Sequence, residues 1–237
     1  MDGEREQGGS AKSGAPAGRR RLLPPLARLA LAYAAGSLPF SNLAATALQG
    51  VDLRSVGTGT VSGTGLYRVA GFCPLAVAGG LDVAKGALGA AAGTGKAPLL
   101  RAACASLAIA GHNWSPWLRG AGGRGLAPAL GASLVLAPEA TAVLALGLGG
   151  GRLVGQTGAG CFLAYLGLGP LLLSTRGRTG LVDAAAISLP LLVKRALGNS
   201  WPPRLEGEKL VSRVLFDRDS PPPRPRLQPG KTARPCP

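Results

Sequence analysis

At residues 111–125 the chain reads GHNWSPWLRGAGGRG, a polar and basic loop between two apolar runs. The loop holds the only histidine of the sequence, His112, and ends in glycines whose backbone N–H groups can approach an anion. Trp114 and Trp117 stand where aromatic side chains anchor membrane spans near the headgroups. The stretch therefore predicts a site for a phosphate-bearing substrate at a membrane surface. From the loop alone, an ordinary cytoplasmic connector explains it equally well, since such connectors are also basic.

The composition favours an integral membrane protein that binds anions. Hydrophobic residues make up 46% of the chain, with 38 glycines and only 4% aromatic residues, and the charges gather in the tails and short loops. Small apolar residues of this kind are typical of closely packed transmembrane helices. The formal net charge is +15, but no basic patch is interleaved with aromatic residues, so nucleic acid is not an expected partner. The lipid bilayer and anionic substrates explain the charge better.

Cysteine spacing gives no sign of a metal site or a disulfide framework. Cys73, Cys104, Cys161 and Cys236 are far apart, and none of them forms a CxxC pair. Three of the four lie in apolar runs, which predicts buried free thiols.

Apolar runs predict an all-α integral membrane protein with six to seven transmembrane helices and cytoplasmic glycine-rich loops. The candidate spans are residues 26–48, 69–93, 99–111, 126–148, 159–173 and 181–193. Pro138 and Glu139 interrupt the fourth run, which can therefore be one span or two, and we favour seven in total. Residues 149–152 are expected to be a connector and residues 174–179 a basic turn.

Three regions follow from this pattern. Residues 1–22 are expected to form a disordered tail, residues 23–198 a transmembrane domain, and residues 199–237 a basic, proline-rich tail. Two spans separate the loop at residues 51–68 from the loop at residues 111–125, so both loops should face the same side. Their basic residues, with those of the C-terminal tail, predict that this side is the cytoplasm.

The loop at residues 51–68 alternates glycines and hydroxyl residues between Arg54 and Arg68. Backbone amides, threonine hydroxyls and a guanidinium group bind phosphate without a metal. A dinucleotide-binding fingerprint does not fit, because no strand precedes the glycines. The alternative is a flexible linker.

Asp82, Lys85 and Asp183 are ionisable residues in the predicted spans. Asp82 and Lys85 are three residues apart, so they share a helix face and are expected to pair inside the helix bundle. Ionisable groups within a span are candidates for function, and the alternative is a structural ion pair. Asp183, near the start of the last span, is expected at the membrane interface.

Three motifs occur in order over residues 36–131. The first is SLP at 37–39 with DLR at 52–54 and GTGTVSGTG at 57–65; the second is DxxKG at 82–86; the third is GHNW at 111–114 with GGRG at 122–125. This set resembles the bacterial acyl-phosphate:glycerol-3-phosphate acyltransferases, the PlsY family. Thr60 and Gly65 stand where the family has asparagines, Ser62 replaces a glycine and Arg124 a lysine. The chain thus resembles a divergent member.

The resemblance implies transfer of a fatty acyl group from acyl phosphate to the sn-1 hydroxyl of glycerol 3-phosphate, in a bacterial plasma membrane. It implies no cofactor and no metal. The expected catalytic residues are His112, Arg54 and Lys85. The expected substrate- and phosphate-binding residues are Ser37, Thr58, Gly59, Thr60, Arg68, Asn113, Gly122, Gly123 and Arg124.

Two other functions remain open at this point. One is a small-solute transporter or channel whose pathway Asp82 and Lys85 would line; inverted repeats would favour it, but the two halves show no convincing similarity. The other is a catalytically silent, lipid-binding relative, which the replaced asparagines favour. The acyl-chain preference and the oligomeric state are not predicted.

Overall fold

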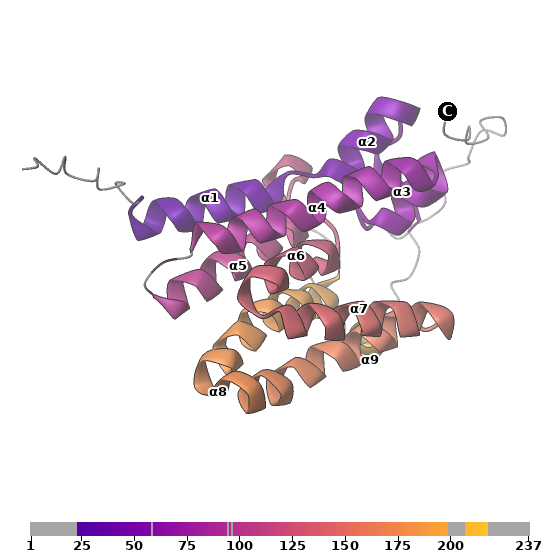
Figure 1. Cartoon of the computed structure of the whole chain (residues 1–237). Coiled ribbons are helices and arrows are strands. Elements are labelled where there is room, and N and C mark those ends of the chain that lie inside the picture. Colours follow the sequence, from indigo (N-terminus) through magenta and orange to yellow (C-terminus); the bar gives the residue numbers. More distant parts are fainter. Residues whose placement is uncertain (1–22, 58, 94, 96, 199–206, 218–237) are drawn as a thin grey trace, which may run out of the picture.

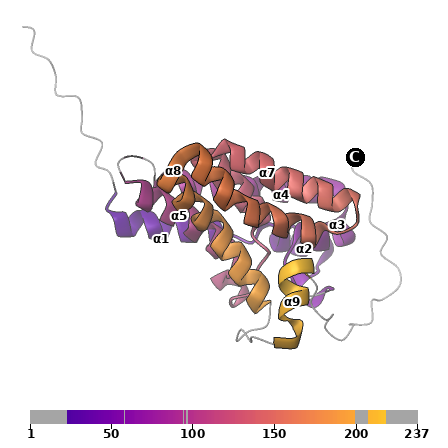
Figure 2. The same ribbon diagram turned by 90° about the horizontal axis from the view of Figure 1, so that it is seen from below.

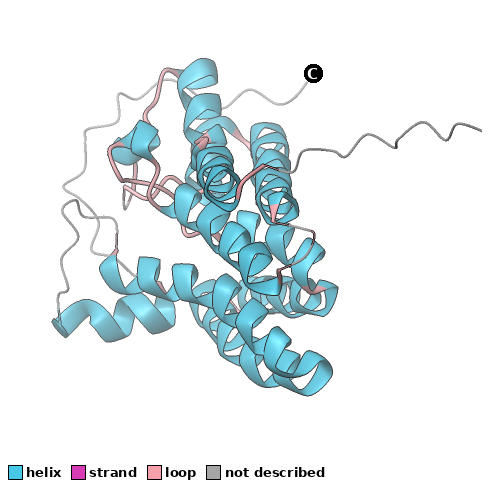
Figure 3. Cartoon of the chain, turned by 90° about the vertical axis from the view of Figure 1, so that its left-hand side faces the viewer, coloured by secondary structure: helices cyan, strands magenta, loops and turns pink. Residues whose placement is uncertain are grey.

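The structure is a computed structural model, and it describes residues 23–57, 59–93, 95, 97–198 and 207–217. These residues form helices joined by loops, with no strand among them (Figure 3). The elements are α1 (Pro25–Ser37), α2 (Phe40–Gln49), the 3-10 helix η1 (Leu53–Ser55), α3 (Gly63–Ala70), α4 (Phe72–Ala92), α5 (Pro98–Asn113), the 3-10 helix η2 (Pro116–Leu118), α6 (Leu126–Leu136), α7 (Pro138–Leu153), α8 (Thr157–Leu197) and α9 (Gly207–Phe216) (Figure 1).

The bundle has two ends, which lie right and left in Figure 1. The motif end holds α2, α3 and the loop at residues 111–125. The far end holds the start of α1 and the ion pairs Arg101–Asp183 and Arg176–Glu139. Seven helical segments run between these ends: α1, α4, α5, α6, α7 and the two limbs of α8. The expected six to seven helices correspond to these seven segments of the described residues. Because the number is odd, the chain enters the bundle at the far end, with α1, and leaves it at the motif end, with the second limb of α8.

The first apolar run is broken at Pro39, so the expectation of one span over residues 26–48 is wrong. Leu38 has extended backbone angles (φ −62°, ψ 120°), and α2 starts only at Phe40. Proline has no N–H to donate, and its ring disfavours a helical conformation at the preceding residue. The break leaves the carbonyl of Leu38 available at the middle of the bundle.

The fourth run is divided at Pro138 into α6 and α7. The glycines expected to form a connector, at residues 149–151, instead belong to α7, and the chain turns beyond them at Gly155 (φ 69°). At Gly147 of α7 only glycine fits, because a Cβ there would lie 2.7 Å from the carbonyl oxygen of Gly160 on α8. Close approach of α7 and α8 therefore needs glycine.

The basic turn expected at residues 174–179 is present inside α8. Gly177 has φ 64° and ψ −146°, which reverses the chain and separates two limbs (Figure 2). These limbs contain the spans predicted at residues 159–173 and 181–193. Asp183 lies near the start of the second limb, at the far end of the bundle, and is 2% exposed. Its expected place at the membrane interface stays a prediction. Its carboxylate pairs with Arg101 of α5 at 3.0 Å.

Small residues bring the central helices into backbone contact. A Cβ at Gly86 of α4 would lie 2.0 Å from the carbonyl oxygen of Pro128, and one at Gly131 of α6 would lie 1.8 Å from that of Val83. Among the described helices, α4 and α8 are long and apolar enough to cross a membrane, and α6 is a shorter apolar helix. The close backbone contacts at these glycines bring the helices near enough for polar groups of α1, α4 and α5 to contact one another.

Expectations for the first glycine-rich loop, the C-terminal tail and the cysteines were met only in part. The loop predicted over residues 51–68 becomes helical from Gly63, because Ser62 caps α3 by accepting a hydrogen bond from the N–H of Gly65 (3.2 Å). The helix α9 was not predicted within the C-terminal tail. Cys104 and Cys161 are buried free thiols as expected, whereas Cys73 is disulfide-bonded. The N-terminal tail at residues 1–22 lies outside the described residues.

Candidate functional site

The predicted ion pair between α4 residues is confirmed, and it lies at the break between α1 and α2. The ammonium of Lys85 is 2.7 Å from Oδ1 of Asp82 and donates a hydrogen bond to the carbonyl oxygen of Leu38. It also lies 5.5 Å from the centroid of the Phe40 ring. Both charged side chains are about 95% buried, at 4% and 5% exposed. Lys85 therefore satisfies the Leu38 carbonyl, which has no helical donor because the helix breaks at this residue.

Asp82 connects three other side chains. Its Oδ1 faces Lys85 and also lies 3.6 Å from Nδ1 of His112, on α5. Its Oδ2 accepts a hydrogen bond from the hydroxyl of Ser41, on α2, at 3.5 Å. One buried carboxylate thus contacts an ammonium, an imidazole and a hydroxyl that come from three helices. This arrangement differs from a Ser-His-Asp triad, because the serine contacts the carboxylate and not the imidazole.

Two glycines join the loop at residues 111–125 to the loop at residues 51–68. The N–H of Gly123 donates to the carbonyl of His112 (3.2 Å), and the N–H of Val61 donates to the carbonyl of Gly122 (3.1 Å). A Cβ at Gly123 would lie 2.1 Å from Nε2 of His112 and 2.8 Å from the carbonyl oxygen of Val61. The prediction that both loops lie at one end of the bundle is confirmed.

Ser37 is held in place by its surroundings. Its hydroxyl donates to the carbonyl of Ala34 (2.7 Å), the satisfied-hydroxyl pattern common in helices, and accepts a hydrogen bond from Nε1 of Trp117 (3.0 Å). The hydroxyl of Ser115 donates to the carbonyl of Ser37 (2.6 Å). The side chains of Ser37 and Ser115 are therefore buried supports between α1 and the loop.

Asn113 also supports the loop. It is fully buried, and its Nδ2 donates to the carbonyl of Pro190 (2.8 Å), in the second limb of α8. Trp114 follows it, and Lys194 of the same limb lies 5.4 Å above the indole ring. The end of α8 thus packs directly against the His112 region.

Arg54 lies on the surface of the motif end, in a bidentate contact with Asp52. Its Nε and Nη2 donate to the carboxylate at 2.5 to 3.1 Å, and the two side chains are 39% and 38% exposed. Asp52 also caps η1 by accepting the N–H of Arg54 at 2.9 Å. The Arg54 hydrogen bond lowers the pKa of the Asp52 carboxyl, and Asp52 raises the pKa of Arg54 in return. Both groups are charged at neutral pH.

The remaining expected phosphate ligands are distributed around the same end. Thr60 is 8% exposed, Gly59 has φ 72°, and Arg68 lies on the exposed face of α3. Arg124 pairs with Asp217, which follows α9, at 3.0 Å. Thr58 lies outside the described residues. The structure thus brings His112, Lys85, Ser37, Asn113, Gly122 and Gly123 into one region of the motif end. Arg54 and Arg68 lie at exposed positions of this end, and Arg124 is paired with Asp217.

Sequence reasoning left several contributors out of the expected site. Asp82 and Ser41 were visible as an intramembrane carboxylate and a hydroxyl two residues after a proline, and the structure joins both in one cluster with His112 and Lys85. Asn42 gave no local signal, yet its side-chain oxygen accepts the N–H of Leu53 (2.8 Å) and fixes the start of η1. Asp217 lies in the basic, proline-rich tail expected over residues 199–237, to which no site residue was assigned.

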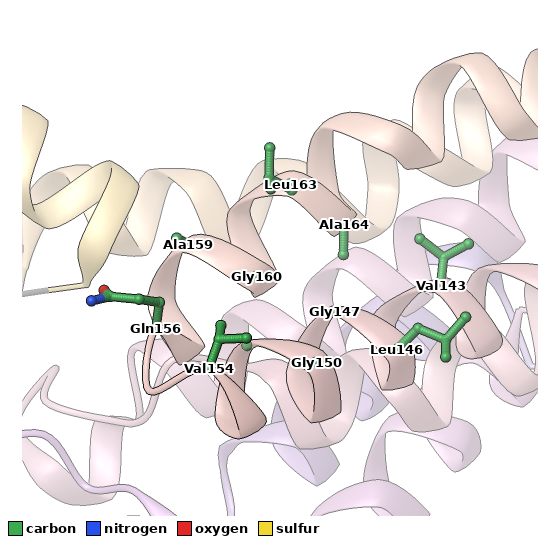
Figure 4. A pocket seen from close by; sticks show the side chains of 11 residues that line it. Val143, Leu146, Gly147, Gly150, Val154, Gln156, Ala159, Gly160, Leu163 and Ala164 are labelled. Carbon is green, nitrogen blue, oxygen red and sulfur yellow. The ribbon is translucent and has the colours of Figure 1, made fainter.

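Two further observations concern a possible metal site and an apolar groove. Within the described residues, no group of three or more His, Cys, Asp or Glu side chains is placed to hold a metal. A groove of about 560 Å³ lies between α7 and α8, with Val143 and Leu163 along its walls and Gln156 near one end (Figure 4). Its lining is almost entirely apolar, and it is separate from the cluster around Asp82.

Residues 26–194 match the family described as glycerol-3-phosphate acyltransferase. A glycerol-3-phosphate acyltransferase of Myxococcus xanthus is 42% identical over 119 residues, which is 49% of this chain and 62% of that protein. A Synechococcus enzyme of the same name is 34% identical over 181 residues, which is 75% of this chain and 90% of its own length. The sequence match thus covers less than two thirds of the first relative and most of the second.

Two crystal structures share the fold. Both are of PlsY (YgiH), described as an integral membrane glycerol 3-phosphate acyltransferase. The glycerol 3-phosphate form has a TM-score of 0.66 at 24% identity, and it covers 83% of this chain and 94% of that one. The lysophosphatidic acid form has a TM-score of 0.61 at 22% identity, over 72% and 87%. This all-helical integral membrane chain belongs to the glycerol-3-phosphate acyltransferase family.

Proposed function

We propose that this protein transfers a fatty acyl group from acyl phosphate to the sn-1 hydroxyl of glycerol 3-phosphate, producing lysophosphatidic acid and inorganic phosphate. The observation that carries the proposal is the convergence of three motifs. Lys85 and Asp82 contact the SLP break, His112 contacts Asp82, and Gly122 binds Val61 of the first glycine-rich loop. Residues far apart in the chain thereby form one polar cluster beside two loops rich in glycine and arginine.

The chemistry needs little beyond binding and orientation. The sn-1 hydroxyl oxygen attacks the acyl carbonyl carbon, the bond from that carbon to the phosphate oxygen breaks, and inorganic phosphate leaves. The hydroxyl proton passes to a phosphate oxygen or to His112. Because the acyl group is already activated, the protein must hold two phosphates, align the reacting atoms and stabilise the developing oxyanion. We propose that no cofactor takes part.

Charged side chains around the cluster fit the two phosphates. We assign Arg54, Arg68 and Arg124 to phosphate binding, since guanidinium groups match phosphate oxygens with two hydrogen bonds. Lys85 adds positive charge deeper in the bundle. Hydrogen-bond donors come from Ser37, Thr58, Thr60, Asn113 and the backbone amides of Gly59, Gly122 and Gly123.

His112 is best suited to orient the acceptor. Its Nδ1 faces the Asp82 carboxylate, and we infer from this that Nδ1 carries the proton. Nε2 is then the acceptor, directed toward Gly123, where the absence of a side chain leaves it uncovered by a Cβ. A hydrogen bond from the sn-1 hydroxyl to Nε2 would align that oxygen. The phosphate dianion of the acceptor leaves less need for a protein base.

We also propose that the protein lies in the bacterial plasma membrane with its motif end in the cytoplasm. Ten Lys and Arg residues occur from Lys194, in the last turn of α8 at the motif end, to the last residue, and eight of them follow α8. Basic residues flanking the spans are retained on the cytoplasmic side.

Purified protein in detergent tests the reaction. We expect labelled lysophosphatidic acid from labelled glycerol 3-phosphate with palmitoyl phosphate, and release of equal amounts of phosphate. Palmitoyl coenzyme A serves as the alternative donor. Product from the coenzyme A ester alone would overturn the donor assignment, and no product from either donor would favour a silent relative.

A further inference from the structure

The C-terminal helix α9 is docked on the motif end through a buried arginine. Arg195, at the end of α8, is 3% exposed, and its Nη1 donates hydrogen bonds to the carbonyls of Val214 and Gly158, both at 2.9 Å. A Cβ at Gly158 would lie 2.2 Å from the carbonyl oxygen of Phe216. The last turn of α9 therefore rests directly on the start of α8, and Figure 2 shows the two helices close together.

Asp217 follows this last turn. Its N–H donates to the carbonyl of Arg213 (3.0 Å), and its φ of 56° places it in the left-handed region. Asp and Asn tolerate this conformation better than most residues with a side chain. The turn directs the carboxylate back toward the bundle, where Oδ1 lies 3.0 Å from Nη1 of Arg124. The two side chains are 25% and 13% exposed.

Arg124 belongs to the loop that supports His112. Its neighbour Gly123 donates a backbone hydrogen bond to the carbonyl of His112. A guanidinium group beside this backbone is well placed to bind a substrate phosphate, which is the role assigned to it above. In this structure the carboxylate of Asp217, a residue of the same chain, is paired with this guanidinium group.

We propose that Asp217 competes with the phosphate of a substrate for Arg124, so that α9 sets the affinity of the site for phosphate. This inference rests on the proposed function of Arg124. A phosphate dianion carries more charge and more acceptor oxygens than a carboxylate, so it displaces Asp217 when it binds. Phosphate must break the internal pair in order to bind, so its apparent affinity is reduced. The apparent affinity equals the intrinsic affinity multiplied by the fraction of protein in which Arg124 is not paired with Asp217.

Asp217→Asn is the appropriate test variant, because Asn keeps the left-handed backbone and removes only the charge. The probe is inorganic phosphate, titrated at constant ionic strength into the full chain in detergent, with the thermal unfolding midpoint as the readout. We expect Asp217→Asn to reach half-maximal stabilisation at about two- to fivefold less phosphate than the wild type, the upper part of the range for an ion pair near the surface. The KM for glycerol 3-phosphate or for palmitoyl phosphate should fall by the same factor.

Two controls make the result specific. Glu139→Gln removes a carboxylate that pairs with Arg176 at the far end, and it should leave phosphate binding unchanged. In an Arg124→Ala background, Asp217→Asn should produce no gain. Arg195→Leu, which removes the clamp on α9 without altering Asp217, should shift phosphate binding in the same direction as Asp217→Asn.

Unchanged or weaker phosphate binding in Asp217→Asn would overturn the inference, whether or not the wild type is active. A wild type that makes no lysophosphatidic acid, combined with tighter phosphate binding in Asp217→Asn, would overturn the proposed reaction and leave the competition at Arg124 intact.

Discussion

Nδ1 of His112 faces Oδ1 of Asp82 across the interface between α5 and α4, at 3.6 Å. The side chains are 11% and 5% exposed, so the contact is largely shielded from solvent. Asp82 also holds Lys85, which in turn binds the carbonyl freed at the SLP break. The imidazole is therefore oriented by a carboxylate whose own position depends on the break between α1 and α2.

His112→Gln separates an orienting role from a basic one. If His112 orients substrate, Gln retains hydrogen-bonding capacity, and we expect kcat/KM to fall by about one decade. A general base would lose about 10²–10⁴ in rate and also the acidic limb of the pH profile. Steady-state kinetics from pH 5 to 9, with circular dichroism to check folding, distinguish the two. A loss of three decades with unchanged substrate affinity would show that orientation is the wrong assignment.

Asp82→Asn should destabilise the bundle strongly. It leaves the buried ammonium of Lys85 without its carboxylate, and removing one partner of a buried ion pair costs about 3–5 kcal/mol. The double variant Asp82→Asn/Lys85→Met should recover most of that stability, because it removes the uncompensated buried ammonium and puts an apolar side chain of similar length in its place. Activity should remain low in both. Thermal unfolding in detergent measures the stability, and equal midpoints for the two variants would contradict the ion-pair account.

Gly123→Ala should disrupt the site more than the fold. The added Cβ would lie 2.1 Å from Nε2 of His112, so the imidazole or the loop must move. We expect a loss of about 10²-fold in kcat/KM and a destabilisation of about 1–3 kcal/mol. Gly149→Ala is the matched control, because a Cβ there meets nothing within 4 Å on an exposed helix position. Similar kinetics in the two variants would contradict the close approach.

Arg54→Ala should weaken substrate binding while the helices remain intact. Loss of a charge-assisted phosphate contact costs about 1.5–3 kcal/mol, or roughly one to two decades in kcat/KM. Assays at neutral pH keep Asp52 ionised in both proteins: in the wild type Arg54 lowers the pKa of its carboxyl, and an aspartate without such a partner is also ionised well above about pH 4. Arg178→Ala removes an exposed arginine near the far-end turn and should have little effect. Unchanged kinetics in Arg54→Ala would remove this residue from the site.

Cysteine labelling tests the orientation in the membrane. Ser115 is 1% exposed, so it is unsuitable, but Ser55 and Trp117 are exposed in the two motif loops. In a background without native cysteines, Ser55→Cys and Trp117→Cys should react with an impermeant reagent only from the cytoplasmic side. Ser174→Cys, near the turn at Gly177, should react only from the opposite side. Labelling of the two loops from different sides would rule out a shared site.

Local features of the chain predicted much of this architecture. The apolar runs, the prolines and the basic turns identify seven passes, since helix length and the absence of a proline N–H act over a few residues. The same spacing argument predicted the pair between Asp82 and Lys85, which lie less than one turn apart. The prediction failed for residues 149–151, where the glycines expected to form a connector instead continue α7; of these, Gly151 lies against the start of α8, and a Cβ there would be 2.9 Å from Cα of Thr157.

Local patterns in the chain predict an all-helical membrane bundle, two basic glycine-rich loops at one end, and the charged residues that each loop carries. They do not predict which of these groups meet, because that depends on how the helices pack. His112 reaches Asp82, Gly122 binds Val61, and Asp217 holds Arg124 because glycine contacts set the separation and register of helices that are remote in the chain. Such distances depend on the packing of the whole bundle, which no local spacing encodes.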